Sequence, residues 1–421
     1  MSGLPETATP GGSGASSNRL VGFSNFQRHN PKSDRFKVLD FDHLDFWCAD
    51  ATSTARRFSS AFGLTMSASS DIDNGNHLYT SYALLSNDVR MVFTAPYWTE
   101  APASPLARVE TFPQFNRDEV FAFVNKHGLG VRAIGLQVEN ATEAYETATA
   151  NGGVGVLKPV TISDANGTIT YSEVQYYADV VFRFVEGRKT YKGSFMPGYV
   201  ERNRKPIGFG LKRIDHVVSN CSCLFDITDH TMKMLGFHEF SEFVAADVGT
   251  VDSGLNSMVM GNNDLTVLLP VNEPTFGTRR KSQIQSFIEH HQGPGVQHIA
   301  ITTTDIIATI KQMVTQGDFG GVDFMPGPGA SYYSDHVPKK MGDMVTKELI
   351  EECQQYGILI DRDEEGGLLQ IFTKPLLDRP TLFIEIIQRI GCALPEGGNK
   401  PACGGFGKGN FGALFKSIED W

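Results

Sequence analysis

The chain has 421 residues, of which 41% are hydrophobic and 10% aromatic, and its formal net charge is −11. This length favours two or more domains with sizeable apolar cores over a single domain. The negative charge argues against a nucleic-acid or membrane-surface binder, and no apolar run approaches the roughly 20 residues that cross a membrane.

Residues 1–20 are rich in Gly, Ser, Thr and Pro and lack an apolar stretch. This composition predicts a disordered leader and excludes a secretory signal peptide. The six cysteines form no CxxC pair, so we expect reduced thiols in a cytoplasmic protein. The plastid is the alternative compartment, because the leader could be the remnant of a transit peptide.

A strand with an Asp-His pair, "FDHLDFWC" at 41–48, opens the first half of the chain. A helix that ends at Gly63 is expected next, followed by the paired strands of "LLSNDVRMVF". A similar unit starts at "GVRAIGLQV" (130–138), continues with a helix capped by Asn140, and closes with "DVVFRFVEG" (179–187). The first half is therefore predicted to contain two βαβββ modules.

The second half repeats this order after a Gly- and Pro-rich linker at 194–210. Its Asp-His strand is "RIDHVVSN" at 213–220, and a helix ending at Gly236 follows at the same spacing as in the first half. The strands "GVQHIAITT" (295–303) and "RPTLFIEIIQR" (379–389) begin and close the second module. Repeats at fixed spacing indicate a duplicated scaffold.

Three corresponding strand positions carry candidate metal ligands in the second half, whereas the first half keeps one of them. The second half has His216, His298 and Glu385 where the first half has His43, Ala133 and Phe184. Because strand side chains alternate, each candidate projects from an otherwise apolar face. A buried imidazole or carboxylate costs free energy there unless it is paired or ligated.

Two imidazoles and one carboxylate, with the opposite positions open, form the facial triad that non-haem Fe(II) favours. Cysteine ligands are missing from this set, which disfavours a structural zinc site. Each residue alone has an ordinary alternative, since a histidine on an apolar strand is usually a satisfied core residue and Glu385 could form a salt bridge. Their homologous positions favour the metal interpretation, while His43 is expected to pack or to form hydrogen bonds.

The motifs "IDHVV", "GPGVQHIAI", "GGLLQIFTKPLLDRPTLFIEIIQR" and "CGGFGKGNF" resemble those of the 4-hydroxyphenylpyruvate dioxygenases, particularly the plant enzymes. The resemblance covers essentially the whole chain beyond the leader. It implies the α+β vicinal-oxygen-chelate fold, with an inactive domain at 21–200, a catalytic domain at 201–421 and a C-terminal gating helix. Each domain is expected to form an open β-barrel from paired βαβββ modules.

The same resemblance implies Fe(II) bound by His216, His298 and Glu385. The reaction that it implies converts 4-hydroxyphenylpyruvate and O2 to homogentisate and CO2. This step belongs to tyrosine and phenylalanine catabolism and, in plants, to plastoquinone and tocopherol biosynthesis. A homodimer is expected. The alternatives are a 4-hydroxymandelate synthase on the same scaffold and a non-catalytic protein that binds an aromatic ligand.

The matching motifs also imply a substrate pocket, in which Gln283 and Gln370 take part in catalysis. The substrate-binding residues that the resemblance implies are Ser257, Pro270, Asn272, Phe372, Phe383, Phe406, Asn410, Phe411 and Leu414. Ordinary packing is the alternative for Phe411, and turn or cap roles are the alternative for Ser257 and Asn272.

The tail after the last glycines carries Phe411 and Leu414 at helical spacing, which predicts a short amphipathic helix on a flexible hinge. Such a helix is suited to gate a barrel mouth. Gly412 and Ala413 stand where the family usually has a Ser-Glu pair. A glycine early in a helix costs up to about 1 kcal/mol relative to alanine, so we expect a looser gate.

Overall fold

The computed structural model describes the chain apart from residues 1–25, 100–110, 113, 246–253, 318, 320, 394–399 and 411–421. The predicted leader and the predicted gate, with Phe411 and Leu414, lie outside the described residues. Among the helices of the described part, none is long and apolar enough to span a membrane.

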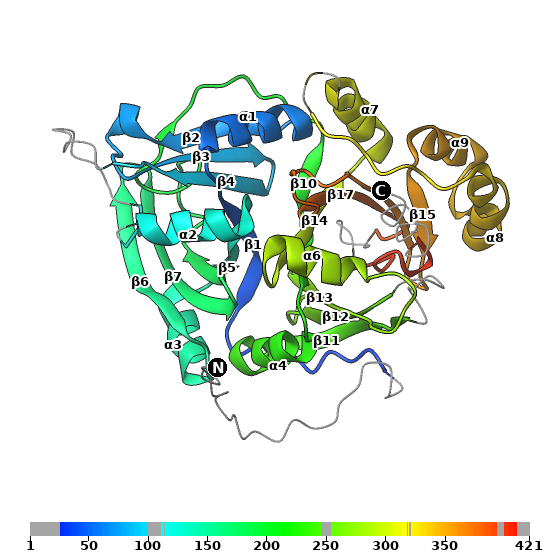
Figure 1. Cartoon of the computed structure of the whole chain (residues 1–421), viewed down its shortest axis with the longest axis horizontal. Coiled ribbons are helices and arrows are strands. Elements are labelled where there is room, and N and C mark those ends of the chain that lie inside the picture. The colour runs from blue at the N-terminus through cyan, green and yellow to red at the C-terminus, as the bar shows by residue number, and fades with distance from the viewer. Residues whose placement is uncertain are drawn as a thin grey trace, which may run out of the picture.

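The first domain is built on one curled nine-stranded sheet (Figure 1). Its strand order is β6-β7-β8-β5-β1-β4-β3-β2-β9. The strands are β1 Val38–Trp47, β2 Thr65–Ser70, β3 Tyr79–Ser86, β4 Val89–Pro96, β5 Gly130–Val138, β6 Gly155–Asp164, β7 Gly167–Tyr177, β8 Val180–Glu186 and β9 Val200–Glu201. The helices are α1 Ala51–Phe62, α2 Arg117–His127 and α3 Ala141–Ala150, with a 3-10 turn η1 at Ile72–Asn74.

The second domain is built on an eight-stranded sheet of order β11-β12-β13-β10-β14-β17-β16-β15. The strands are β10 Leu211–Asn220, β11 His238–Phe243, β12 Leu255–Gly261, β13 Leu268–Pro274, β14 Gly295–Thr303, β15 Leu359–Arg362, β16 Gly367–Phe372 and β17 Phe383–Ile390. The α-helices are α4 Leu224–Leu235, α6 Gln283–His291, α7 Ile306–Gly317, α8 Val337–Met341 and α9 Lys347–Tyr356. The short turns are η2 Tyr332–His336, η3 Gly342–Met344 and η4 Lys408–Asn410.

Both sheets have the same internal plan. In the first, β1 pairs with β4 in parallel and with β5 antiparallel, and β5 pairs with β8 in parallel. In the second, β10 takes the place of β1, with β13, β14 and β17 as the corresponding partners. The predicted α+β architecture of two βαβββ modules per half is therefore confirmed. The two sheets lie side by side with their central strands toward the middle of the molecule (Figure 1).

The predicted helix ends are also observed. Asn140, the predicted cap, begins α3 by accepting hydrogen bonds from the Thr142 and Glu143 amides. The cap of α1, which was not predicted, is Asp50, which accepts a hydrogen bond from the Ser53 amide. Gly63 ends α1 and Gly236 ends α4 in the left-handed conformation, with φ of 66° and 80°. A Cβ atom at Gly63 would lie 2.5 Å from the Phe209 ring, so this turn has no room for a larger residue.

The strand register corrects one predicted correspondence between the two halves. In the second domain His216 faces Ala300, which in turn faces Glu385 on β17. In the first domain His43 lies against Gly135, and Gly135 faces Arg183 on β8. The first-domain counterpart of Glu385 is therefore Arg183 and not Phe184. The error is a single residue, which is enough to place a strand side chain on the opposite face.

A second correction concerns the cysteines. Cys392, just after β17, and Cys403 form a disulfide bond across the segment that leads to η4, so the expectation of reduced thiols is wrong for this pair. The other four cysteines are free, and Cys223 is the exposed one among them.

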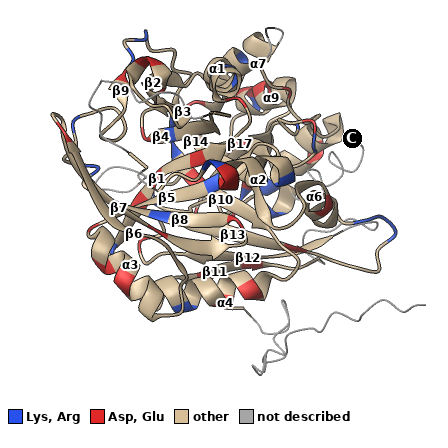
Figure 2. Cartoon of the chain, turned by 60° about the vertical axis from the view of Figure 1, so that its left-hand side comes forward, with Lys and Arg blue, Asp and Glu red and all other residues tan. Residues whose placement is uncertain are grey.

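Basic and acidic residues are interspersed over both domains (Figure 2).

Candidate metal centre

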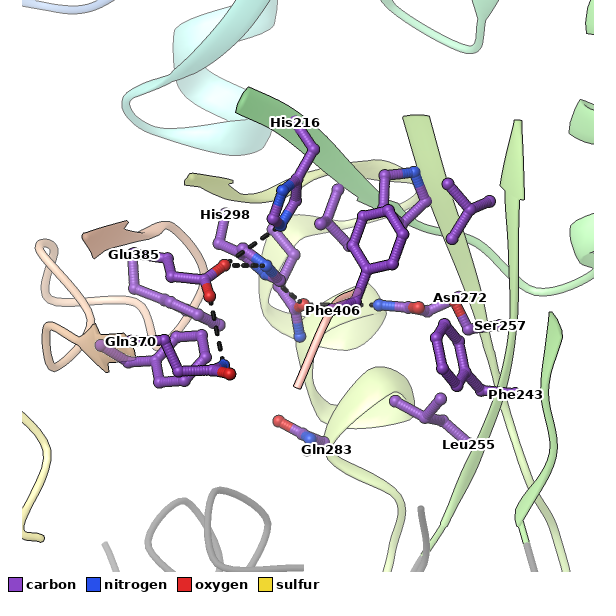
Figure 3. Close-up of a pocket in the computed structure, with 16 residues that line it drawn as sticks. His216, Phe243, Leu255, Ser257, Asn272, Gln283, His298, Gln370, Glu385 and Phe406 are labelled. Atoms are coloured by element: carbon purple, nitrogen blue, oxygen red, sulfur yellow. Dashed lines mark hydrogen bonds and ion pairs between the residues drawn. The ribbon is translucent and has the colours of Figure 1, made fainter. Parts of the chain in front are cut away.

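Three strands bring the predicted ligands to one point inside the second barrel. His216 comes from β10, His298 from β14 and Glu385 from β17, and their ligand atoms all lie within 4.8 Å of one another. Glu385 Oε2 is 3.1 Å from His216 Nε2 and 3.5 Å from His298 Nε2. Figure 3 shows the three side chains converging on one side of the pocket. These positions meet because β14 is hydrogen-bonded between β10 and β17.

Each histidine is held through its other ring nitrogen. His216 Nδ1 donates to Asp215 Oδ2 at 2.9 Å, and His298 Nδ1 donates to Gln297 Oε1 at 3.0 Å. Arg389 in turn donates to both carboxylate oxygens of Asp215, at 3.0 and 2.6 Å. An imidazole that donates through Nδ1 presents its lone pair at Nε2, so both Nε2 atoms are prepared to ligate a cation.

The electrostatics of the cluster fit a divalent cation. Burial lowers the pKa of His216, but its contacts with Asp215 and Glu385 outweigh burial and raise the pKa to about 9. Burial raises the pKa of Glu385, and the two histidines outweigh it and lower that pKa. Burial lowers the pKa of His298. The buried, ionised carboxylate of Glu385 therefore favours a positive charge next to the two Nε2 atoms, and a bound metal ion would provide that charge.

The cavity beside the triad brings together most of the predicted pocket residues. Those that line it are Ser257, Pro270, Asn272, Gln283, Gln370, Phe372, Phe383 and Phe406. Sequence reasoning missed Val218, Phe243, Leu255, Val259 and Gln297, which also line it. Of these, Gln297 carried a signal, because it directly precedes a candidate ligand. Phe243, Leu255, Ser257 and Asn272 lie away from Glu385 and Gln370 in the pocket (Figure 3).

A chain of amides connects the triad to the residues that precede the tail. Gln370 Nε2 donates to Glu385 Oε1 at 3.2 Å, and Asn410 Nδ2 donates to Gln370 Oε1 at 3.3 Å. Tyr332 donates to Asn410 Oδ1 at 2.7 Å. The Phe406 ring packs edge-on against His216, with 5.2 Å between ring centroids. The described end of the chain therefore covers the triad, and Asn410 reaches it through Gln370 rather than by lining the cavity.

The first domain fills the equivalent point with a guanidinium. Arg183 Nη1 donates to His43 Nε2 at 2.9 Å and to Asp45 Oδ2 at 3.1 Å, while its Nε donates to Glu173 Oε1 at 2.7 Å. His43 Nδ1 donates to Asp42, as His216 does to Asp215. The expectation that His43 forms hydrogen bonds is therefore confirmed. With Arg183 beside His43 and Ala133 in place of a second imidazole, this point offers no metal-ligand set.

Comparisons with known proteins agree with these features. The chain is 47% identical over 414 residues to the 4-hydroxyphenylpyruvate dioxygenase of Arabidopsis thaliana, covering 96% of this chain and 92% of that protein. It is 47% identical over 411 residues to the enzyme of the same name from Plectranthus scutellarioides, covering 96% and 93%. No family model matches the chain.

Among solved structures, a triple mutant of 4-hydroxymandelate synthase from Streptomyces coelicolor superposes with a TM-score of 0.73. The match covers 91% of this chain and 98% of that one, at 22% identity. At this identity the likeness concerns the fold alone, which is the vicinal-oxygen-chelate fold predicted from the sequence.

Proposed function

Because the chain belongs to the 4-hydroxyphenylpyruvate dioxygenase family, we propose that it converts 4-hydroxyphenylpyruvate and O2 to homogentisate and CO2. The observation that carries the proposal is the convergence of His216, His298 and Glu385 within 4.8 Å beside a largely apolar cavity. The alternative of a binding protein without turnover does not account for three such donors at one point.

We propose Fe(II) as the resident metal. His216 and His298 would bind it through Nε2 and Glu385 through a carboxylate oxygen, which is the donor set that non-haem iron favours. When bound, the iron supplies coordination sites for the 2-oxo acid group and for O2, and the electrons that activate oxygen. Asp215 and Gln297 keep the imidazoles in the required tautomer, and Gln370 holds the carboxylate from its other oxygen.

The rest of the pocket would position the aromatic ring and exclude water. Phe372, Phe383 and Phe406 provide apolar walls near the triad. Ser257, Asn272 and Gln283 provide hydrogen-bonding groups that suit the phenol end of the substrate. Pro270 and the predicted residues Asn410, Phe411 and Leu414 complete the proposed set, with the last two on the gate.

Product identification tests the proposal. Protein loaded anaerobically with Fe(II) is mixed with 4-hydroxyphenylpyruvate and O2, and the products are separated and identified. Homogentisate with one CO2 per turnover is expected. 4-Hydroxymandelate would instead assign the synthase activity, and binding of the substrate with no product would leave a ligand-binding protein.

A matched pair of variants links the reaction to the triad. Glu385→Gln should abolish turnover and weaken iron binding while the circular dichroism spectrum stays unchanged. Glu173→Gln, which alters a partly buried carboxylate of the first domain, should retain turnover. Full activity in Glu385→Gln would end the assignment of this metal site.

We further propose a homodimer in the cytoplasm, with the plastid as the alternative compartment. Family resemblance supports the dimer, and light scattering of the purified protein tests it. Fractionation of cells with an antibody to the protein decides between the compartments.

A further inference from the structure

A second cavity, here called the interdomain cavity, lies where the first domain meets the start of the second. It has a volume of about 370 Å³ and shares no lining residue with the pocket beside the triad. Its lining residues are Leu39, Asp40, Phe41, Asp88, Arg90, Gln137, Arg188, Lys189, Arg213 and Ile214. The β3–β4 turn closes one side by docking on β10, where the Asp88 amide donates to the Lys212 carbonyl at 2.9 Å.

The lining carries more positive than negative charge. Arg90, Arg188, Lys189 and Arg213 face Asp40 and Asp88. Arg188 is already neutralised, because it donates to both oxygens of Asp42 behind the cavity wall at 2.7 and 2.9 Å. Arg213 donates to Asp40 at 3.1 Å and to the Thr266 carbonyl at 2.7 Å.

Arg90 is the unexplained member of this group. Its Nε and Nη1 atoms are buried, and among the described residues they have no hydrogen-bond partner. Burial lowers the pKa of this guanidinium, and the nearby charge of Arg188 adds to that effect, while Asp42 and Asp88 oppose it without cancelling it. A buried charged donor without a partner costs free energy, so a group that satisfies it is expected in the functional protein.

We infer that the interdomain cavity binds a small dianionic oxyanion, with Arg90 as its anchor. The planar guanidinium presents paired N–H donors that match the oxygens of a phosphate or a carboxylate. Lys189 adds positive charge from the first domain, and Arg213, which is already paired with Asp40, lines the cavity from the second domain, so the ligand would bridge the two domains. Free phosphate, phosphorylated metabolites and dicarboxylates share this chemistry.

Titration calorimetry on the full-length, iron-loaded protein tests the inference. Inorganic phosphate and succinate are titrated separately in chloride buffer at constant ionic strength, so that non-specific screening is matched. Saturable binding of at least one of the two is expected, and the arm that binds more tightly distinguishes a phosphate ligand from a dicarboxylate ligand. Equal weak heats for phosphate, succinate and added chloride would overturn the inference.

Variants place the binding. Arg90→Met should lower the affinity at least tenfold, whereas Arg117→Met, which removes another guanidinium with an unpaired buried nitrogen outside the cavity, should leave it unchanged. Lys189 is exposed, so Lys189→Met should fold even if Arg90→Met does not, and it should also lower the affinity for the dianion. Glu385→Gln should bind the dianion as well as the wild type does. Loss of binding in Glu385→Gln would place the anion at the triad and contradict the inference.

Discussion

Replacing Asp215 by Asn isolates what the residues behind the metal ligands contribute. Asn keeps the shape of the side chain and can still accept a hydrogen bond from His216 Nδ1, but it removes a buried negative charge. That charge balances Arg389, which donates to it at 2.6 and 3.0 Å. The substitution therefore leaves a buried guanidinium without its counter-ion and makes His216 a weaker ligand.

Two separate losses are expected. Breaking a buried ion pair by removing one partner costs about 3–5 kcal/mol of folding free energy. Mutation of a group that orients a metal-binding histidine lowers metal affinity about 10- to 100-fold. The first domain offers a matched control, because Asp42 accepts from His43 and is paired with Arg188 in the same arrangement. Asp42→Asn should lose a similar amount of stability without changing iron affinity.

The assay measures both quantities on both variants. Urea unfolding of the metal-free proteins gives the stability loss, and anaerobic competition with a chelator gives the Fe(II) affinity. If Asp215→Asn and Asp42→Asn lose the same amount of Fe(II) affinity, the loss reflects general destabilisation, and the proposal that Asp215 orients His216 is wrong. The same conclusion follows if Asp215→Asn binds iron as tightly as the wild type.

Three further predictions follow from the same contacts. Phe372→Ala should lower the affinity for flat aromatic diketones about tenfold or more and leave iron affinity unchanged, and equal losses by calorimetry would assign Phe372 to the fold instead. Arg183→Met should destabilise the protein by about 3–5 kcal/mol, because it strands Asp45 and Glu173, and iron stoichiometry should stay the same. Burial raises the pKa of Asp42, but Arg188 and His43 hold it well below its usual range. The ionised Asp42 therefore contributes its full stability above the unfolded pKa of about 4, and this contribution is lost as the pH falls toward the folded pKa. Between about pH 7 and pH 3, the free energy of unfolding of Asp42→Asn should therefore fall less than that of the wild type.

The duplicated scaffold was predictable because its signals are local. Glycines that end helices, such as Gly63 and Gly236, recur at one spacing from each Asp-His pair, and the order of strands follows from them. The resemblance carried by motifs such as "GPGVQHIAI" is confirmed by relatives that cover 96% of the chain. The convergence of His216, His298 and Glu385 could be predicted because each lies on the inward face of a corresponding strand.

The features that were missed depend on register and on contacts between distant segments. The sequence repeat alone aligns Phe184 with Glu385, whereas the pairing of β5 with β8 shows that Arg183 holds this position. Nothing in the sequence marks Arg389 as a partner of Asp215, since the two residues are 174 positions apart. The Cys392–Cys403 bond has no spacing motif, and it forms because β17 ends beside the segment that leads to η4.

Arg183 also explains how the first half of the duplicated scaffold keeps its fold without a metal-ligand set at this point. A cluster with His43, Asp45 and Glu173 needs a cation, because unpaired buried carboxylates are costly. In the second domain, Glu385 faces two imidazoles at the corresponding point and, within the described part of the chain, no guanidinium. A bound metal ion would supply the positive charge, so the stability of the second domain should depend on metal. In the first domain the positive charge is the Arg183 guanidinium on β8, so the stability of this domain should be independent of metal. Chelation should therefore lower the unfolding temperature of the second domain selectively, and hydrogen exchange at β14 and β17 compared with β5 and β8 would detect the difference.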